Sequence, residues 1–350
     1  MRLNQLMAAA APADAVTNQA IAWRRVLAAH GVGGEIYAEH VHPDLREVVR
    51  PLTHFEPDPA AVSLLRYSIW SAAAERAREV PAGRLGLLYH NITPGRLLAE
   101  GQPGVAALCD RGRRELPGFA GRVRVAIADS GFNATELEAA GIEPVTVVPL
   151  LLDIASGPSR GPAGSVAPVV LSVGRVVPSK RLEEAIRAVA LLRARRPEVT
   201  LELIGSWEGF ERYRGALGRF ARHLGVGDAV RFRGRVSDAE RDAAYARAGV
   251  YLCTSAHEGF CAPLVEAMAR GLPVVAHDAG AVAETLGGAG LVIPDADPAL
   301  TAEALQAVIE DDPLRATLAA RASRRLAELH PSAVEPRILA ALEPLIGAVE

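Results

Sequence analysis

The sequence predicts an α/β protein made of two doubly wound domains that face each other across a cleft. Three observations predict this fold. Strand and helix patterns alternate clearly along the second half, a fainter alternation runs through the first half, and a segment rich in glycine, proline and serine separates the halves. Strands separated by helices form a parallel sheet covered on both faces. A length of 350 residues suits two such domains.

Composition shifts set the predicted boundaries. We place an N-terminal domain at residues 1–155, a linker at 156–165, a C-terminal domain at 166–330 and a helical tail at 331–350. The linker, SGPSRGPAGS, has the composition of a flexible connector. The tail could pack on either domain, including back on the N-terminal one. The cleft between the domains is the default ligand site.

The first half contains short apolar strands and amphipathic helices. Its opening, MRLNQLMAAAAPADA, imitates a secretory signal only faintly, because the apolar run is short and rich in alanine, so we interpret it as a first strand running into a loop. Further strands are predicted in GEIYAEH, RLGLLYHN, RVRVAIADS and PVTVVPLLLD, and helices over Gln19–His30, Val105–Leu116 and Ala134–Ala140.

The second half alternates more legibly. The run VAPVVLSVGR is short, β-branched and ends in glycine, which is typical of a buried strand. Further strands are predicted in VTLELIG, AVRFRGRV, GVYLCTS, LPVVAHD and GLVIPD, and helices over Ser179–Arg196, Phe210–Leu224, Asp238–Ala248, Pro263–Arg270 and Pro298–Leu329.

Charge and cysteine content narrow the functional classes. A net charge of −3 gives no general attraction to nucleic acid or to anionic lipid. Cys109, Cys253 and Cys261 are sparse, odd in number and lack a metal-binding spacing, which favours a reducing, cytoplasmic location and no metal. No stretch is long and apolar enough for a membrane helix. Peripheral membrane contact and a homodimer remain open.

The segment SVGRVVPSKRLEEA predicts an anion site. It contains Lys180, the single lysine among 38 basic residues, together with Arg175, after a strand that ends at Gly174. Loops that follow parallel strands gather at one edge of the sheet, where ligands bind. Two cations beside a helix start, which Ser179 would cap, suit a diphosphate. Taken alone, the segment is explained equally well as an ordinary solvated basic loop.

The segment HEGFCAPLVEAMA places an acid on either side of a turn. Glu258 precedes the glycine-containing turn, Pro263 suits a first helical position, and Glu266 is expected in the first turn of that helix. The alternative is a loop acid and an acid that complements the helix dipole. The order of strand, acid, glycine turn, proline-led helix and acid is more specific than the spacing alone.

This order resembles the signature of family-4 retaining glycosyltransferases, enzymes of the GT-B type with two facing Rossmann-like domains. The family motif E-G-F-x-x-P-x-x-E stands here as Glu258 to Glu266, and A-x-A-x-G-x-P-V-V follows it as Ala267 to Val275. LIGSWEGF and RFRGRVSDAE match the family's next strand ends. The resemblance is strong from Val166 to about Arg321, roughly half of the chain.

The resemblance implies roles for residues of the second half. Arg175 and Lys180 would hold the donor diphosphate, Glu258 the hydroxyls of the donor sugar, and Glu266 the nucleotide ribose. The other donor-binding positions that it implies, several of them through the backbone, are Gly174, Gly205, Arg235, Val236, Gly259, Phe260, Cys261, Leu264 and Val265.

The first half departs from the commonest family pattern. Instead of a Gly-Gly loop after the first strand it has D-A-x-x-N, with Y-H-N-I-T-P and D-S-x-F-N further on, and it resembles a variant group with these segments. By this resemblance His90 would face the donor sugar. The segments also give the candidates for acceptor and cleft contacts, which are Asp14, Asn18, Asn91, Ser130 and Asn133. Turn and cap chemistry explains the asparagines equally well.

The predicted function is transfer of a sugar from a nucleotide-diphosphate donor to a hydroxyl acceptor with retention, as in hexosyltransferases. By the resemblance, the acceptor attacks on the leaving-group face. Fixed positive charge would make a cofactor or metal unnecessary. A nucleotide-linked dehydrogenase is disfavoured because no G-x-G-x-x-G follows an early strand. A glycosidase would need the two carboxylates to flank the scissile bond. A catalytically degenerate nucleotide-sugar-binding protein is the remaining alternative.

Overall fold

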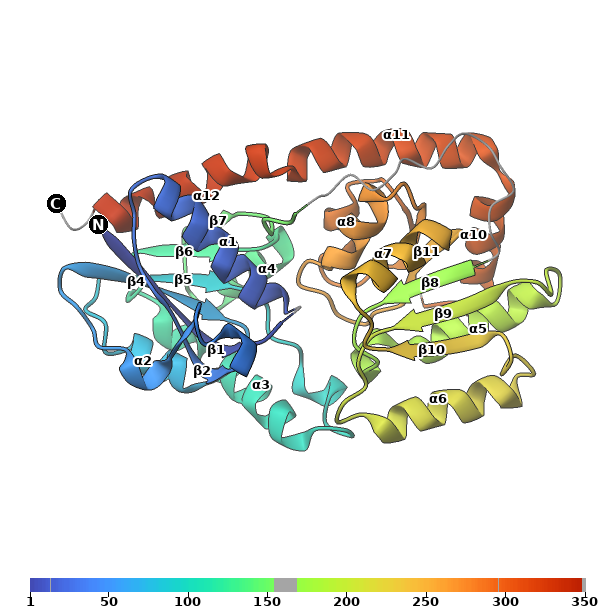
Figure 1. Cartoon of the computed structure of the whole chain (residues 1–350), viewed down its shortest axis with the longest axis horizontal. Coiled ribbons are helices and arrows are strands. Elements are labelled where there is room, and N and C mark those ends of the chain that lie inside the picture. The colour runs from blue at the N-terminus through green and yellow to red at the C-terminus, as the bar shows by residue number, and fades with distance from the viewer. Residues whose placement is uncertain (13, 154–168, 295, 348–350) are drawn as a thin grey trace. The chain divides into compact units, whose positions relative to one another are not determined.

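The computed structural model describes residues 1–12, 14–153, 169–294 and 296–347 (Figure 1). The chain divides into two compact units. Unit 1 comprises residues 1–95, 104–153 and 329–350, and unit 2 comprises residues 96–103 and 154–328. The linker predicted at 156–165 lies outside the described residues. The residues of the helical tail are assigned to unit 1.

Unit 1 contains a parallel sheet with strand order 3-2-1-4-5-6-7. Its described strands in spatial order are β3 (Arg50–Pro51), β2 (Ile36–Val41), β1 (Arg2–Ala10), β4 (Ala61–Tyr67), β5 (Leu85–Tyr89), β6 (Val125–Ala128) and β7 (Val145–Val147). Its helices are α1 (Ala15–Ala29), α2 (Ala72–Ala77), α3 (Pro103–Glu115), α4 (Gly131–Ala139) and α12 (Pro331–Ile346). The order reverses between β1 and β4.

Unit 2 repeats this topology with order β10-β9-β8-β11-β12-β13. Its described strands are β8 (Val169–Val173), β9 (Thr200–Ile204), β10 (Val230–Gly234), β11 (Val250–Cys253), β12 (Val274–His277) and β13 (Leu291–Ile293). Its helices are α5 (Leu182–Arg193), α6 (Glu211–His223), α7 (Asp238–Arg247), α8 (Ala262–Ala269), α9 (Val282–Leu286), α10 (Pro298–Glu310) and α11 (Asp312–Leu329). Here the order reverses between β8 and β11.

Two parallel doubly wound sheets confirm the predicted fold class. The central strands are almost continuously buried, as in the run VYLC of β11, because helices cover both faces of such sheets. Helix α12 buries Val334, Ile338, Leu342 and Leu345 in the core of unit 1, where they cluster with Val62 of β4. These positions recur at helical spacing, so one face of α12 completes that core.

The sequence analysis missed β4, the central strand of unit 1. All seven of its residues are buried, although one of them is Arg66. A charged residue inside a seven-residue run, with the prolines of FEPDP before it, breaks the apolar pattern that marks a strand. The predicted helix Pro298–Leu329 is in fact two helices, which end and restart at Asp311.

Candidate functional site

The strand reversal in unit 2 brings two loops together. The loop after β8 contains Lys180 and the loop after β11 contains Glu258, and these strands are neighbours in the sheet. The Thr254 hydroxyl donates to the carbonyl of Lys180 at 2.8 Å, and the amide of Ala256 donates to the carbonyl of Ser179 at 2.8 Å. Ligands bind at such reversal points in doubly wound sheets because the flanking loops part there.

An ion pair forms the centre of this junction. The ammonium of Lys180 lies 2.5 Å from Oε1 of Glu258, and the Ser255 hydroxyl donates to the same oxygen at 2.6 Å. Burial by itself lowers the pKa of Lys180, but attraction to Glu258 outweighs it and holds the pKa above its ordinary value. Lys180 is therefore a fixed positive charge at physiological pH.

A small hollow opens beside this pair. Its lining includes Gly174, Arg175, Lys180, Glu258 and Cys261, so five of the predicted site residues share one hollow. Arg175 is exposed, with its guanidinium 5.8 Å from the centroid of the Phe210 ring. Gly174 adopts φ 148°, and a Cβ there would stand 3.6 Å from the Lys180 side chain. One wall of the hollow is thus positively charged.

The helix beside the hollow begins differently from the prediction. α8 starts at Ala262, after Cys261 in a left-handed conformation with φ 69°. Glu266 consequently lies beyond the first turn, and it is not among the residues that line the hollow. It accepts a 2.9 Å hydrogen bond from the Tyr245 hydroxyl, whose pKa is raised first by burial and then by this carboxylate. Tyr245 holds the carboxylate in one orientation.

The predicted cap of α5 is also wrong. Ser179 lies in a 3₁₀ turn over Pro178–Lys180, and α5 begins at Leu182 after Arg181, which has φ 48°. The backbone around Lys180 is therefore a tight turn and not the first turn of an α-helix. The two contacts to Thr254 and Ala256 fix this turn against the neighbouring loop.

Several donor-side positions have structural explanations. A Cβ on Gly205, which has φ 149°, would lie 1.9 Å from the carbonyl oxygen of Gly174, so the ends of β8 and β9 approach too closely for a side chain. Leu264 and Val265 are buried in the core, and the amide of Leu264 donates to the carbonyl of Cys261 at 3.0 Å. The other predicted donor positions lie around the same strand ends, with Arg235 and Val236 after β10, and Gly259 and Phe260 after β11.

Gly280 belongs to the family resemblance without a predicted role, and the structure gives it one. Its φ is 59°, and a Cβ there would stand 2.2 Å from the carbonyl oxygen of Glu258. The next amide, of Ala281, donates to that carbonyl at 2.9 Å. The Gly280 turn thus fixes the backbone of Glu258 while Ser255 and Lys180 fix its carboxylate.

The cysteines are closer together than their spacing suggested. The Sγ atoms of Cys253 and Cys261 are 4.0 Å apart. With a Glu258 oxygen they form a group whose potential ligand atoms all lie within 4.8 Å of one another. The Lys180 ammonium already neutralises that carboxylate. The spacing of these two cysteines fits no metal motif, yet the fold brings their sulfur atoms together.

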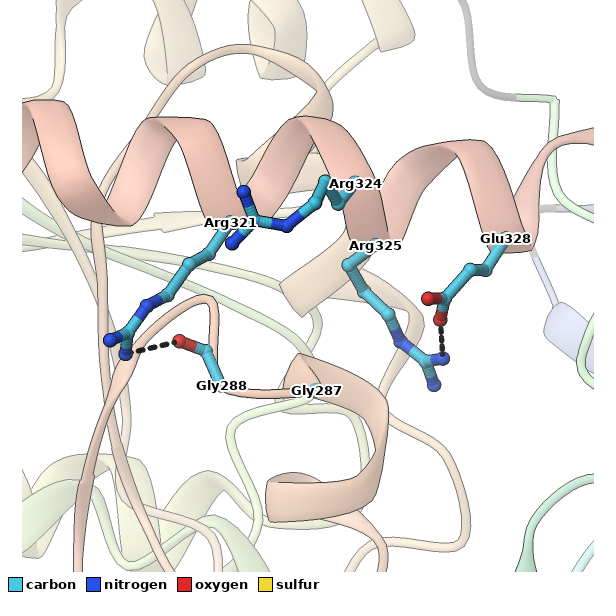
Figure 2. Close-up of a pocket in the computed structure, with 6 residues that line it drawn as sticks. All are labelled: Gly287, Gly288, Arg321, Arg324, Arg325 and Glu328. Carbon is cyan, nitrogen blue, oxygen red and sulfur yellow. Dashed lines mark hydrogen bonds and ion pairs between the residues drawn. The ribbon is translucent and has the colours of Figure 1, made fainter.

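A second hollow in unit 2 has a structural role (Figure 2). Arg325 of α11 donates to the carbonyls of Glu284 and Thr285 at 2.9 and 3.0 Å, and Arg321 donates to the carbonyl of Gly288 at 3.3 Å. These acceptors lie at the end of α9, where helical carbonyls lack intrahelical partners. The arginines therefore cap α9.

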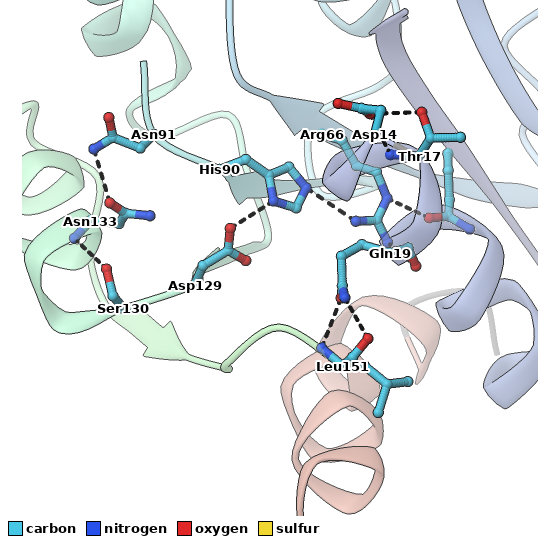
Figure 3. A network of polar contacts seen from close by, with 11 residues as sticks. Asp14, Thr17, Gln19, Arg66, His90, Asn91, Asp129, Ser130, Asn133 and Leu151 are labelled. Atoms are coloured by element: carbon cyan, nitrogen blue, oxygen red, sulfur yellow. Dashed lines mark hydrogen bonds and ion pairs between the residues drawn. The ribbon is translucent and has the colours of Figure 1, made fainter. Parts of the chain in front are cut away.

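In unit 1 the predicted residue His90 lies within a buried polar network (Figure 3). Its Nδ1 is 2.7 Å from Oδ2 of Asp129, and its Nε2 is 3.1 Å from Nη1 of Arg66. A guanidinium only donates, so Nε2 accepts and the ring proton resides on Nδ1, which donates to Asp129. Both ring nitrogens of a neutral His90 are thus engaged within the unit.

Arg66 is the centre of this network. Its Nε donates to Oε1 of Gln5 at 2.6 Å, and its guanidinium lies 4.9 Å from the centroid of the Trp23 ring. Burial lowers the pKa of Arg66 to about 9, although attraction to Asp129 opposes this effect. The side chains of Arg66 and Gln5 thus join β4 and β1, the two strands between which the order reverses.

The polar residues predicted for acceptor contacts make local bonds. Asp14 caps α1 by accepting from the amide of Thr17 at 2.8 Å, so α1 begins before Asn18, which was expected to open it. Ser130 caps α4 in the same way, accepting from the amide of Asn133 at 3.1 Å. The side-chain amide of Asn91 donates from Nδ2 to Oδ1 of Asn133 at 2.9 Å (Figure 3). Cap and turn chemistry therefore accounts for several of these residues.

The C-terminal half matches a known family model. The model described as "Glycosyl transferases group 1" covers residues 161–325, just under half of the chain. The resemblance to glycosyltransferases is confirmed at this level. The matched region contains the whole Lys180–Glu258 junction.

Curated relatives extend this similarity. The chain is 35% identical over 232 residues to a phosphatidyl-myo-inositol mannosyltransferase of Mycolicibacterium smegmatis, covering 64% of this chain and 58% of that protein. It is 35% identical over 211 residues to a D-inositol 3-phosphate glycosyltransferase of Kineococcus radiotolerans, covering 53% of this chain and 48% of that protein. The chain thus matches only about half of these relatives' length.

Solved structures match along almost the whole chain. Sucrose-phosphate synthase of Thermosynechococcus elongatus superposes with a TM-score of 0.76 at 18% identity, covering 99% of this chain and all of that one. HepE of Anabaena, solved with UDP and glucose, superposes with a TM-score of 0.72 at 22% identity, covering 98% and 99%. These likenesses, with the two parallel sheets, identify the fold as GT-B.

Proposed function

We propose that this chain is a hexosyltransferase that moves a sugar from a nucleotide-diphosphate donor to a hydroxyl acceptor, with retention of configuration as in family-4 enzymes. The observation that carries the proposal is the Lys180–Glu258 pair beside Arg175 in one hollow at a strand reversal. A fixed cation and a fixed carboxylate in one hollow suit a ligand with a diphosphate at one end and sugar hydroxyls at the other.

The proposed roles follow from charge and position. Lys180 and Arg175 bind the donor diphosphate, and the N-terminus of α8 adds its partial positive charge. Negative charge grows on the diphosphate as the glycosidic bond breaks, so these preorganised groups stabilise the transition state more than the bound donor. Glu258 accepts hydrogen bonds from the donor sugar, and Glu266 accepts them from the ribose.

The acceptor is proposed to attack from the leaving-group face, with a diphosphate oxygen receiving its proton. The cationic groups replace a metal ion in this scheme. We therefore expect transfer to continue in the presence of a chelator. Inhibition by EDTA that added Mg²⁺ reverses would contradict this part of the proposal.

The proposal is tested by binding and by turnover. A ligand that binds the native state raises the melting temperature, so the chain is screened by thermal shift against UDP, UDP-glucose and nucleotide-linked mannose. Donors that stabilise it are then assayed for transfer to inositol-containing and simple alcohol acceptors. We expect one donor class to stabilise the chain and to give an α-linked product. A product with inverted configuration would contradict the retaining mechanism.

The same experiment separates the alternative functions. Donor binding without turnover over the acceptor panel would favour a degenerate nucleotide-sugar-binding protein. Stabilisation by a nicotinamide dinucleotide, with none by a nucleotide sugar, would favour a dehydrogenase. Hydrolysis of a glycoside in the absence of nucleotide would favour a glycosidase.

A further inference from the structure

Two cysteines meet beneath the loop that carries Glu258. Cys253 is the last residue of β11, Cys261 immediately precedes α8, and their Sγ atoms are 4.0 Å apart. Cys253 and Cys261 are only 4% and 7% exposed, yet both line the hollow beside Lys180.

The surroundings distinguish the two thiols. The hydrogen bond to Cys261 lowers the pKa of the Cys253 thiol. Burial and the charge of Glu258 raise this pKa, whereas Lys180 and the Ser255 hydroxyl lower it. The same bond raises the pKa of the Cys261 thiol. The Ser255 hydroxyl lies 3.5 Å from Sγ of Cys253 and can donate to a thiolate there, so Cys253 is the thiol whose ionised form this site stabilises.

We propose that Cys253 and Cys261 are a redox modification site, at which peroxide forms a reversible disulfide that restrains the Glu258 loop. The Cys253 thiolate attacks hydrogen peroxide, so that an S–O bond forms, the O–O bond breaks and hydroxide leaves. Cys261 then attacks the sulfenic sulfur, and a second hydroxide leaves as the S–S bond forms. The two thiols lose two electrons and two protons, and the peroxide becomes two waters.

The disulfide changes the geometry of the loop. An S–S bond is about 2 Å long, so the sulfur atoms must approach by about 2 Å from their present 4.0 Å. The carbonyl of Phe260, next to Cys261, accepts a 2.5 Å hydrogen bond from the Thr285 hydroxyl. The disulfide therefore restrains the segment between the cysteines, which contains Ser255 and Glu258. The consequence for transfer rests on the proposed function.

The covalent step is tested by mass. The full chain is treated with hydrogen peroxide in EDTA, then analysed intact and after non-reducing digestion. We expect the loss of two hydrogens, a cross-linked pair of peptides with Cys253 and Cys261, and reversal by dithiothreitol. Cys253→Ala should lose the cross-link and Cys109→Ala should keep it. Oxygen addition without a cross-link, or no change in mass, would overturn the proposal.

The regulatory step is tested by rate. A shift of about 1 Å at a catalytic group can cost on the order of 100-fold, so oxidised chain should transfer sugar at least about tenfold more slowly than reduced chain. Cys253→Ala should keep its own untreated rate after peroxide. A disulfide without any loss of rate would refute the regulatory role. If no condition gives transfer, the proposed function fails while the mass analysis still decides whether the disulfide forms.

Discussion

The strand reversal borders a hollow in unit 2 and is bridged by a buried hydrogen bond in unit 1, although the two sheets share the same order around it. In unit 2 the loops after β8 and β11 leave a space beside the Lys180–Glu258 pair. In unit 1 the corresponding strands β1 and β4 carry Gln5 and Arg66, whose side chains bond to each other at the reversal.

The difference shows that the fold supplies a position and that particular side chains decide its use. Lys180 is 25% exposed at its side chain and can meet a ligand, whereas Arg66 is 1% exposed and satisfies protein groups. We therefore expect variants of the unit 2 pair to reduce transfer, and variants of the unit 1 network to reduce stability.

Lys180→Ala gives the largest expected effect. Loss of one preorganised charge at the leaving group typically costs 10² to 10³ in rate, so we expect kcat/KM for transfer to fall about 100-fold or more. Lys180→Arg should also be impaired, because a planar guanidinium does not replace a compact ammonium. Steady-state kinetics with the cognate donor measure both.

A matched control for Lys180→Ala is Arg212→Ala, which removes an exposed cation of α6 in the same unit. It should transfer at the wild-type rate. Full activity of Lys180→Ala would contradict the assignment of unit 2 as the donor site.

Arg66→Ala should act on stability. It removes a buried cation and leaves acceptors on Gln5 and His90 without their donor, and breaking a buried charged network typically costs about 3–5 kcal/mol. Arg66→Met, which restores volume, should cost less. Urea denaturation measures the free energy of unfolding, with the exposed Arg46→Ala as control. A loss below about 1 kcal/mol would show that the network does not stabilise unit 1.

Tyr245→Phe gives a smaller expected effect in unit 2. It removes only the hydroxyl that orients Glu266, and a single hydrogen bond contributes about 1 kcal/mol, or about fivefold in an equilibrium constant. We expect the KM for the nucleotide donor to rise by about this factor while kcat stays near wild type. An equal fall in kcat at constant KM would indicate that Glu266 acts on the reaction and not on ribose binding.

His277 gives the smallest expected effect, seen in the pH dependence of stability. Burial, with a contribution from Arg181, lowers its pKa from the ordinary 6.5. The unfolded chain therefore binds a proton that the folded chain does not, and stability falls as pH decreases below 6.5, by at most about 1.4 kcal/mol per pH unit for one proton.

The mutant His277→Gln isolates this term. It can keep a donor to the Thr301 hydroxyl, which lies 3.1 Å from Nε2 of His277, but it does not titrate. Denaturation between pH 5 and 7.5 should show a flatter profile than wild type. An unchanged slope would assign the acid sensitivity to other groups.

The sequence predicted unit 2 better than unit 1. Most of its strands are short apolar runs next to glycine or proline, and its motif residues Lys180 and Glu258 follow adjacent strands. In unit 1, β4 escaped prediction because Arg66 interrupts its apolar pattern. Asp129 had no predicted role beyond its place in the D-S-x-F-N motif, because no local pattern links it to His90, 39 residues earlier.

Some contacts that position the site residues could not be predicted from the sequence for the same reason. Tyr245 reaches Glu266 from another helix, and Gly280 meets the carbonyl of Glu258 from the loop after β12. Such contacts depend on how strands are ordered in the sheet and not on spacing along the chain.

The sequence by itself determined the alternation of strands and helices, because periodicity and turn chemistry are local properties. The GT-B class and the donor-motif residues were implied by the resemblance to family-4 glycosyltransferases. Only the tertiary structure decided that Arg66 bridges the strands at one reversal, that a hollow lies beside the other, and that Cys253 and Cys261 meet. Those outcomes arise from long-range packing, which brings together side chains from strands far apart in the chain.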